Sequence, residues 1–249
     1  MNDASEQVNQ NRREFIGKAA ASVALFALAP GVKLVDLVFA RPPDQPVSGA
    51  VRWGMLIDAS RCAEGCDACV RACDEEFGLE RSARPELDTH YIRMLNVHDR
   101  QTGRTFSLPM LCQHCEHPPC VDVCPTGASF RRADGIVLVD KHICIGCRYC
   151  MMACPYKARS FVHEPLHNQK PYAPRGIGTV ESCTFCVHRV DRGRTPACVE
   201  ACAATGHHAM VFGDLNDANS AIAERRRAQP SQEVRADLDL NTAVRYEGI

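Results

Sequence analysis

Sixteen cysteines are the residues of this 249-residue chain whose number and spacing indicate chemistry. Exposed free thiols oxidise, so this many thiols need to be held by metal or joined as disulfides. They form four groups of four, which read Cys62-x3-Cys66-x2-Cys69-x3-Cys73, Cys112-x2-Cys115-x4-Cys120-x3-Cys124-Pro125, Cys144-x2-Cys147-x2-Cys150-x3-Cys154-Pro155 and Cys183-x2-Cys186-x11-Cys198-x3-Cys202. In each group the last two cysteines are four positions apart.

The third group has the C-x2-C-x2-C-x3-C-P spacing of bacterial ferredoxins. Three thiolates on a tight loop can surround one face of an iron–sulfur cubane. We expect the fourth cysteine, Cys154, to start a short helix behind the loop and to point toward a neighbouring cluster. Pro155 suits that position because it fixes φ and ends the ligand loop. Gly65 and Gly146 lie where the backbone must pass close to sulfide.

Three other uses of the cysteines fit the pattern less well. Disulfide scaffolds are normally shorter than this chain and lack closely spaced triplets. Zinc sites join two C-x2-C pairs over a longer spacer, which leaves the third and fourth cysteine of each group unexplained. A c-type haem needs C-x-x-C-H, and no C-x-x-C motif here is followed by histidine. Sixteen thiolates in this pattern are therefore predicted to hold four [4Fe–4S] clusters.

Two groups depart from the usual spacing. The first group has x3 where x2 is usual, so we expect a bulged loop at residues 63–65 that could alter the potential of its cluster. In the fourth group, Ala203 stands where a proline often follows the last cysteine.

The segments between the cysteine groups must position the ligand loops. The apolar run 51–58 predicts a strand that leads into the first group. Two hairpins are predicted from strand-forming runs and glycine-containing turns, one over 91–110 and one over 128–140. A terminal helix is predicted over 214–229, with Asp217 or Ser220 near its start and three arginines in its last turn.

These segments predict an α+β protein of two ferredoxin-like modules, with four cysteine-ligated cluster loops joined by short strands and helices. The second and third groups form one two-cluster module, and the first and fourth groups form the other. The expected organisation is a signal peptide at 1–40, a leader with the first group and an insert at 41–104, a two-cluster module at 105–165, and the fourth group with a C-terminal extension at 166–249.

The composition argues against several other classes of protein. With 29 Lys+Arg and 30 Asp+Glu, the chain is neither a strongly basic nucleic-acid binder nor an acidic disordered tail. Four of the ten histidines, His114, His117, His142 and His188, lie beside cysteines, where contact with sulfur or solvent is expected rather than ligation, because each cluster already has four thiolates. We find no catalytic constellation, which leaves little support for a catalytic subunit acting directly on a small sulfur or nitrogen compound.

The N-terminus predicts export. Arg12 and Arg13 precede an apolar run of about eleven residues, which is shorter than the ~20 needed to span a bilayer. In the stretch Val38-Phe39-Ala40, small residues occupy the outer and inner positions of a cleavage site. The arginine pair followed by Glu-Phe-Ile resembles a twin-arginine signal, so we expect a periplasmic protein that folds before export and keeps no transmembrane span after cleavage.

The four groups, with the x11 gap in the last, resemble the four-cluster electron-transfer subunits of respiratory complexes. That family includes the iron–sulfur subunits of dimethyl-sulfoxide, polysulfide and nitrite reductase systems. Stretches at 112–116, 118–128, 133–140 and 183–193 are similar, more specifically, to the DsrO group, the periplasmic iron–sulfur subunits of sulfite-reduction-associated DsrMKJOP complexes.

The resemblance implies how the ligands are shared. By that pattern each cluster takes three thiols of one group and the last thiol of another. The four implied sets are Cys62, Cys66, Cys69 and Cys202; Cys183, Cys186, Cys198 and Cys73; Cys112, Cys115, Cys120 and Cys154; and Cys144, Cys147, Cys150 and Cys124.

The resemblance also implies a function and partners. The chain is expected to relay electrons between an integral membrane, quinone-interacting subunit and a periplasmic multihaem cytochrome c, in dissimilatory sulfite or sulfide metabolism. The alternative within this class is the iron–sulfur subunit of a polysulfide-, nitrite- or molybdoenzyme-type reductase. A zinc- or disulfide-stapled binding protein is the alternative from another class.

Overall fold

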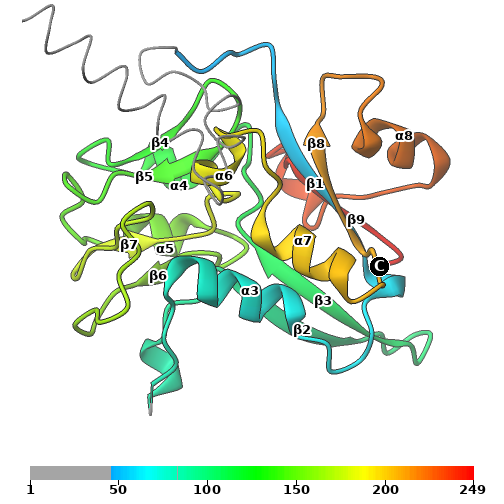
Figure 1. The fold of residues 1–249 in the computed structure, drawn as a ribbon, viewed down its shortest axis with the longest axis horizontal. Coiled ribbons are helices and arrows are strands. Elements are labelled where there is room, and N and C mark those ends of the chain that lie inside the picture. The colour runs from blue at the N-terminus through cyan, green and yellow to red at the C-terminus, as the bar shows by residue number, and fades with distance from the viewer. Residues whose placement is uncertain (1–45, 83) are drawn as a thin grey trace, which may run out of the picture. The chain divides into compact units, whose positions relative to one another are not determined.

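Three segments far apart in the sequence form one sheet in the computed structural model, which describes residues 46–82 and 84–249 (Figure 1). Strand β1 (Trp53–Asp58) lies in the middle, antiparallel to β8 (Met210–Asp214) and parallel to β9 (Val244–Glu247). Because β1 has a neighbour on both sides and its last five residues are buried, it is apolar at consecutive positions rather than alternating. The strand expected before the first cysteine group is thus confirmed.

Two helices that carry cysteines pack against each other beside this sheet: α3 (Ala68–Phe77) and α7 (Ala197–Ala204) (Figure 1). Each has two buried cysteines four positions apart. Residues at i and i+4 share one face of a helix, so each helix presents two thiols on the same side. We call these helices, the β8-β1-β9 sheet and the first and fourth cysteine groups the α3–α7 half.

The second and third cysteine groups lie among two short hairpins and two short helices, which we call the α4–α5 half. The hairpin expected at 128–140 is confirmed, and its turn contains Gly135 at φ +89°. The elements of this half are α4 (Pro119–Asp122), β4 (Ser129–Arg131), β5 (Val137–Val139), α5 (Tyr149–Ala153), β6 (Ser160–Phe161) and β7 (Val180–Glu181). The two helices contact each other. Together the halves confirm the predicted α+β class.

The expected position of the short helix in the third group was wrong. Cys154 does not start a helix, because α5 begins at Tyr149, contains Cys150 and ends at Cys154. In the second group, likewise, α4 contains Cys120 and ends before Cys124. The x3 spacing is one helical turn, so the helix connects the third cysteine of a group to the fourth.

The hairpin expected over 91–110 is also confirmed, as β2 (Ile92–His98) and β3 (Thr105–Leu111). Strand β3 continues directly into the second cysteine group. The remaining short elements are η1 (Ala59–Arg61), η2 (Pro85–Leu87), α6 (Val187–Val190) and η3 (Ala236–Leu238).

The terminal helix α8 (Ala221–Ala228) is shorter than the sequence predicted. Ser220 caps it by accepting a hydrogen bond from the backbone N–H of Ala223. Ser220 is one of the two residues that the sequence placed near the start of this helix. The segment from Asp214 is not helical, because Asp214 ends strand β8, where its carboxylate accepts the backbone N–H of Arg52.

The cysteines are part of the core rather than additions to it. Buried cysteines from both halves pack with Met55, Phe77, Leu111 and Tyr246 in one cluster, which explains how a chain with few aromatics forms an interior. Within the part of the chain that the structure describes, none of the helices has the length and apolarity to cross a membrane. The predicted signal peptide at 1–40 lies outside the described residues.

Candidate metal-cluster sites

All sixteen cysteines lie in the described part of the chain, and none of them forms a disulfide there. Eleven are buried. Four are half-buried, namely Cys62, Cys66, Cys124 and Cys144, and Cys147 is exposed.

The first and fourth groups meet in the α3–α7 half, where Cys62, Cys66 and Cys69 lie together with Cys202. Burial, followed by nearby charge on Cys202 and Cys66, raises the pKa of Cys62 to about 11. Burial and the same neighbours raise the pKa of Cys69 to about 12. The backbone N–H of Ala209 donates to the Cys202 sulfur at 3.2 Å. These charge interactions indicate that the four thiols lie near one another, and we call the set site 1; among the described residues, no three such side chains lie close enough to hold a single metal ion.

The other thiols of these two groups form site 2. Cys73 on α3 is buried next to Cys183, Cys198 and Cys186, and burial followed by their charges raises the pKa of Cys73 well above its usual value. All four side chains of this set are buried. One cysteine of the first group thus lies near three of the fourth.

Two hollows in the α4–α5 half are lined by the remaining eight thiols. One is lined by Cys112, Cys115, Cys120 and Cys154, which we call site 3. The other is lined by the four cysteines of site 4, which are Cys124, Cys144, Cys147 and Cys150. All thiols of site 3 are buried, whereas site 4 includes the exposed Cys147.

Neighbouring sites are close enough for their thiols to interact. After burial and the charge of Cys186, the charge of Cys69 in site 1 raises the pKa of Cys198 in site 2. Besides burial, the charge of Cys112 in site 3 raises the pKa of Cys183 in site 2. In the same way, the charge of Cys150 in site 4 raises the pKa of the buried Cys120 in site 3. The sites therefore follow one another in the order 1, 2, 3, 4, with the two fully buried sites in the middle.

The chemistry of these donors fits an iron–sulfur cluster. Four thiolates in one buried place repel each other, so they need a cationic centre, which soft thiolates bind well. Backbone amides also point at sulfur: Ser129 N–H donates to Cys124 at 3.3 Å and Phe185 N–H to Cys183 at 3.5 Å. At Cys124 such hydrogen bonds outweigh partial burial and lower its pKa, which stabilises the thiolate.

The extra residue of the first group is accommodated in a turn. The backbone N–H of Cys66 donates to the carbonyl of Ala63, and Glu64 and Gly65 are exposed. Gly65 has φ +73°, and a Cβ there would meet nothing within 4 Å. The expected bulge is thus present and points to solvent, and it does not keep Cys66 from its set.

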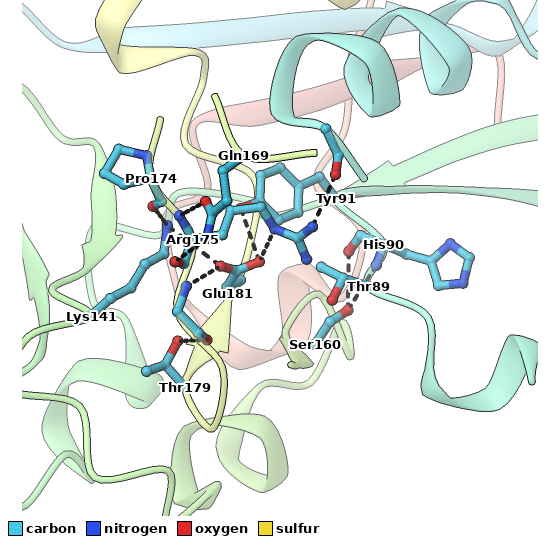
Figure 2. Close-up of polar contacts among 12 residues, drawn as sticks. Thr89, His90, Tyr91, Lys141, Ser160, Gln169, Pro174, Arg175, Thr179 and Glu181 are labelled. Atoms are coloured by element: carbon cyan, nitrogen blue, oxygen red, sulfur yellow. Dashed lines mark hydrogen bonds and ion pairs between the residues drawn. The ribbon is translucent and has the colours of Figure 1, made fainter. Parts of the chain in front are cut away.

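A buried carboxylate fixes the segments before the third and fourth cysteine groups, a feature that the sequence did not suggest. Glu181 accepts hydrogen bonds from Arg175 Nε at 2.9 Å and Tyr91 Oη at 3.4 Å, and Lys141 Nζ lies 3.6 Å away (Figure 2). Lys141 lies three residues before Cys144, and Glu181 two residues before Cys183. Only the tertiary structure brings these charges together.

Two of the histidines beside cysteines, His114 and His188, have side-chain partners within the protein. His114 is buried, its Nδ1 accepts the backbone N–H of Val137, and its ring packs on Phe185 with centroids 3.7 Å apart. Burial, followed by the charge of Arg159, lowers the pKa of His114 to about 3, so the ring is neutral. His188 forms a hydrogen bond of 2.7 Å with Glu76.

Comparison with known proteins identifies iron–sulfur domains in this chain. Residues 61–128 and 104–215 each match the 4Fe-4S dicluster domain. The chain is 38% identical to the Hdr-like menaquinol oxidoreductase iron-sulfur subunit 1 of Archaeoglobus fulgidus over 263 aligned positions, covering 95% of this chain and 97% of that protein. It is 38% identical to a subunit of the tetrathionate reductase of Salmonella typhimurium, covering 87% and 78%, and 39% identical to protein NrfC of Escherichia coli K12, covering 73% and 74%.

Two dicluster domains and sixteen clustered cysteines account for four [4Fe–4S] clusters. The Archaeoglobus fulgidus relative, which is matched over 97% of its length, is named as an iron–sulfur subunit. The chain therefore belongs to the family of 4Fe-4S dicluster electron-transfer subunits of oxidoreductase complexes.

Proposed function

We propose that sites 1 to 4 are the four ligand sets, each holding one cluster. What supports this assignment is that every site contains three thiols of one group and one thiol of its partner group. The x3 spacing accounts for the exchange, because it places the third and fourth cysteines of a group on the same face but one helical turn apart along the axis, so that each can lie at a different, adjacent site.

A single cysteine tests the assignment of site 4. Replacing Cys147 with serine should damage the cluster of site 4 and leave the clusters of sites 1 and 2 intact. Iron content and EPR spectra of the anaerobically purified chain measure this. Unchanged iron and unchanged spectra would contradict the assignment.

We further propose that electrons pass along the sites in the order 1, 2, 3, 4 or the reverse. The observation that carries this proposal is the gradient of burial: the two middle sites have only buried thiols, whereas Cys62 and Cys66 at one end and Cys147 at the other reach solvent. Each cluster supplies a one-electron redox centre. The chain contributes spacing, insulation from water and potential, and sites at the surface are where partners can exchange electrons.

The exposed end at site 4 has an apolar rim that suits a protein partner. Ile145 and Met152 are 68% and 67% exposed, and Tyr149 and Ile143 are also exposed. Exposed apolar groups gathered at one place mark interaction surfaces more often than groups scattered singly. We propose that a subunit carrying its own redox cofactor docks here.

The finer physiological assignment follows from the relatives and from the stretches resembling the DsrO group. We propose a subunit that connects a quinone-interacting membrane subunit with a periplasmic multihaem cytochrome c in sulfite or sulfide metabolism. One relative is named as part of a menaquinol oxidoreductase and another as part of a tetrathionate reductase, which supports quinol and sulfur chemistry. Export by the twin-arginine route and a periplasmic location, peripheral to the inner membrane, belong to this proposal.

The proposed organisation keeps the divisions 1–40, 41–104, 105–165 and 166–249. The first is the signal, the third holds most of the α4–α5 half, and the second and fourth supply the first and fourth cysteine groups. Mass spectrometry of the exported chain tests the signal. If the signal is cleaved after Ala40, Arg41 should be the N-terminal residue.

Affinity purification of the native complex decides between the two physiological assignments. The proposed function predicts that a multihaem cytochrome and a membrane subunit copurify with this chain. Copurification of a molybdenum-containing catalytic subunit instead would favour the alternative, a subunit of a molybdoenzyme-type reductase, which the similarity to the tetrathionate reductase protein also allows.

A further inference from the structure

Arg159 lies between sites 3 and 4. It follows Cys154 by five residues and precedes strand β6, and its side chain is buried at 5% exposure. The hollow of site 3 and the hollow of site 4 both have Arg159 in their lining. One side chain therefore faces both sets of thiols.

The guanidinium of Arg159 has no carboxylate partner among the described residues. Its Nε, Nη1 and Nη2 atoms are all buried, and none of them donates to an oxygen there. A buried cation without a partner is costly, so proteins rarely keep one unless a negative group accompanies it.

Other buried arginines of this chain show the usual arrangement. Arg175 is paired with Glu181, and Arg189 is paired with both Glu76 and Glu200. Arg159 differs from them because the negative groups nearest to it are thiolates. Burial would lower its pKa, but charge on Cys120, Cys112 and Cys150 reverses that effect.

We propose that Arg159 is a shared counter-cation of the clusters at sites 3 and 4 and raises the reduction potential of both. Reduction adds an electron to a group already held by four thiolates, so a fixed positive charge nearby favours the reduced form. A buried charge is poorly screened, which makes its effect larger than that of an exposed arginine. The inference rests on the proposed ligand sets.

Redox titration followed by EPR on the loaded full-length chain tests this role. Arg159→Gln and Arg159→Met remove the charge, and Gln keeps a hydrogen-bond donor. Both should lower two of the four midpoints by at least a tenfold change in the reduction equilibrium, about 59 mV for a one-electron couple. Arg159→Lys keeps the charge and should change the equilibrium less than threefold.

Arg148→Met is a charge-matched control. Arg148 lies in the ligand loop of site 4 and also lines its hollow, but its side chain is exposed and stacks over Phe161. Solvent screens its charge, so its loss should shift the midpoint of site 4 less than the loss of Arg159 does.

Loss of clusters is also informative. If the neutral variants lose iron at sites 3 and 4 while the Lys variant keeps it, a positive charge is required there and the proposal stands. Unchanged midpoints in fully loaded neutral variants would overturn it, as would a Lys variant that behaves like the Gln variant.

Failure of this inference can be told apart from failure of the ligand assignment. Unshifted midpoints in a chain with about sixteen irons reject only the role of Arg159. Wild-type protein that holds fewer irons, or a Cys147→Ser variant that keeps its full iron content and spectra, rejects the ligand sets themselves.

Discussion

The α3–α7 half and the α4–α5 half share one arrangement of cysteines, but the charges and the exposure around the thiols differ between them. In both, two loop thiols and one helix thiol of a cysteine group lie together, and the fourth thiol, four residues further on, lies at the neighbouring site. In the first half the buried Arg189 is balanced by two carboxylates, whereas in the second half Arg159 faces thiols alone. The comparison teaches that the cysteine pattern sets where clusters bind, whereas the charges and the exposure around each site set their properties.

The largest expected difference between the halves lies in what a lost ligand does to the fold. Cys198 is buried on α7 and lies near enough to Cys186 of site 2 and Cys69 of site 1 for their charges to raise its pKa, after burial, whereas Cys147 is exposed. Cys198→Ser should therefore lower the thermal midpoint and disturb two clusters. Cys147→Ser should lose or convert one cluster, roughly a quarter of the iron at most, with little effect on folding.

Iron analysis and thermal unfolding of both variants measure this contrast. If both variants lost the same amount of iron and the same thermal stability, the clusters of the two halves would support the fold equally.

The packing of the segments before the third and fourth cysteine groups should depend on Glu181. Its replacement by alanine leaves the buried Arg175 side chain and the half-buried Lys141 without their counter-charge, which should destabilise the chain by about 3–5 kcal/mol. Denaturant unfolding measures this, with Glu164→Ala as control, because Glu164 forms an exposed pair with Arg84 that is worth ~0–1 kcal/mol. A Glu181 variant as stable as the control would show that the buried pair does not support the fold.

The potentials of the two halves should also differ. Sites 3 and 4 share the unbalanced charge of Arg159, and site 1 has the carboxylate of Asp58 nearby instead. We therefore expect the clusters of sites 3 and 4 to be reduced at higher potentials than those of sites 1 and 2. EPR-monitored titration, with the signal of site 4 identified through Cys147→Ser, measures the order, and the reverse order would contradict this electrostatic interpretation.

The smallest expected effect concerns two glycines in ligand loops of the two halves. Gly65 and Gly146 have similar φ values of +73° and +69°. A Cβ on Gly146 would overlap the carbonyl oxygen of Gly178, whereas one on Gly65 would meet nothing within 4 Å. Gly146→Ala should cost ~1–3 kcal/mol beyond the backbone strain of about 1 kcal/mol that both alanine variants share. Equal stability losses in denaturant unfolding would show that the loop of site 4 can relax.

The sequence predicted the class of the fold, because that follows from local spacing and from a resemblance that covers most of the chain. The sharing of the fourth thiol in each set came from the resemblance alone, and it stays a proposal. The sequence placed the helix of the third group wrongly, since spacing alone does not tell whether Cys154 begins or ends a turn. It also started the last helix at Asp214, which is instead the last residue of strand β8 and pairs with Trp53 of β1.

The roles of Glu181 and Arg159 could not be predicted in the same way. In the sequence, Arg159 is only one of several basic residues near the cysteines. Its distinguishing property is that no acidic side chain of the described residues pairs with it, and this depends on how distant segments pack. Such contacts leave no signal in a single sequence.

Iron and acid-labile sulfide per chain, determined on anaerobically purified protein together with EPR after stepwise reduction, test the four-site arrangement most directly. The arrangement predicts about sixteen irons and interacting signals from several reduced cubanes. About twelve irons would mean that one site does not fill, with the x3 loop of site 1 the first to examine. Zinc, or no metal, would contradict the electron-transfer function itself.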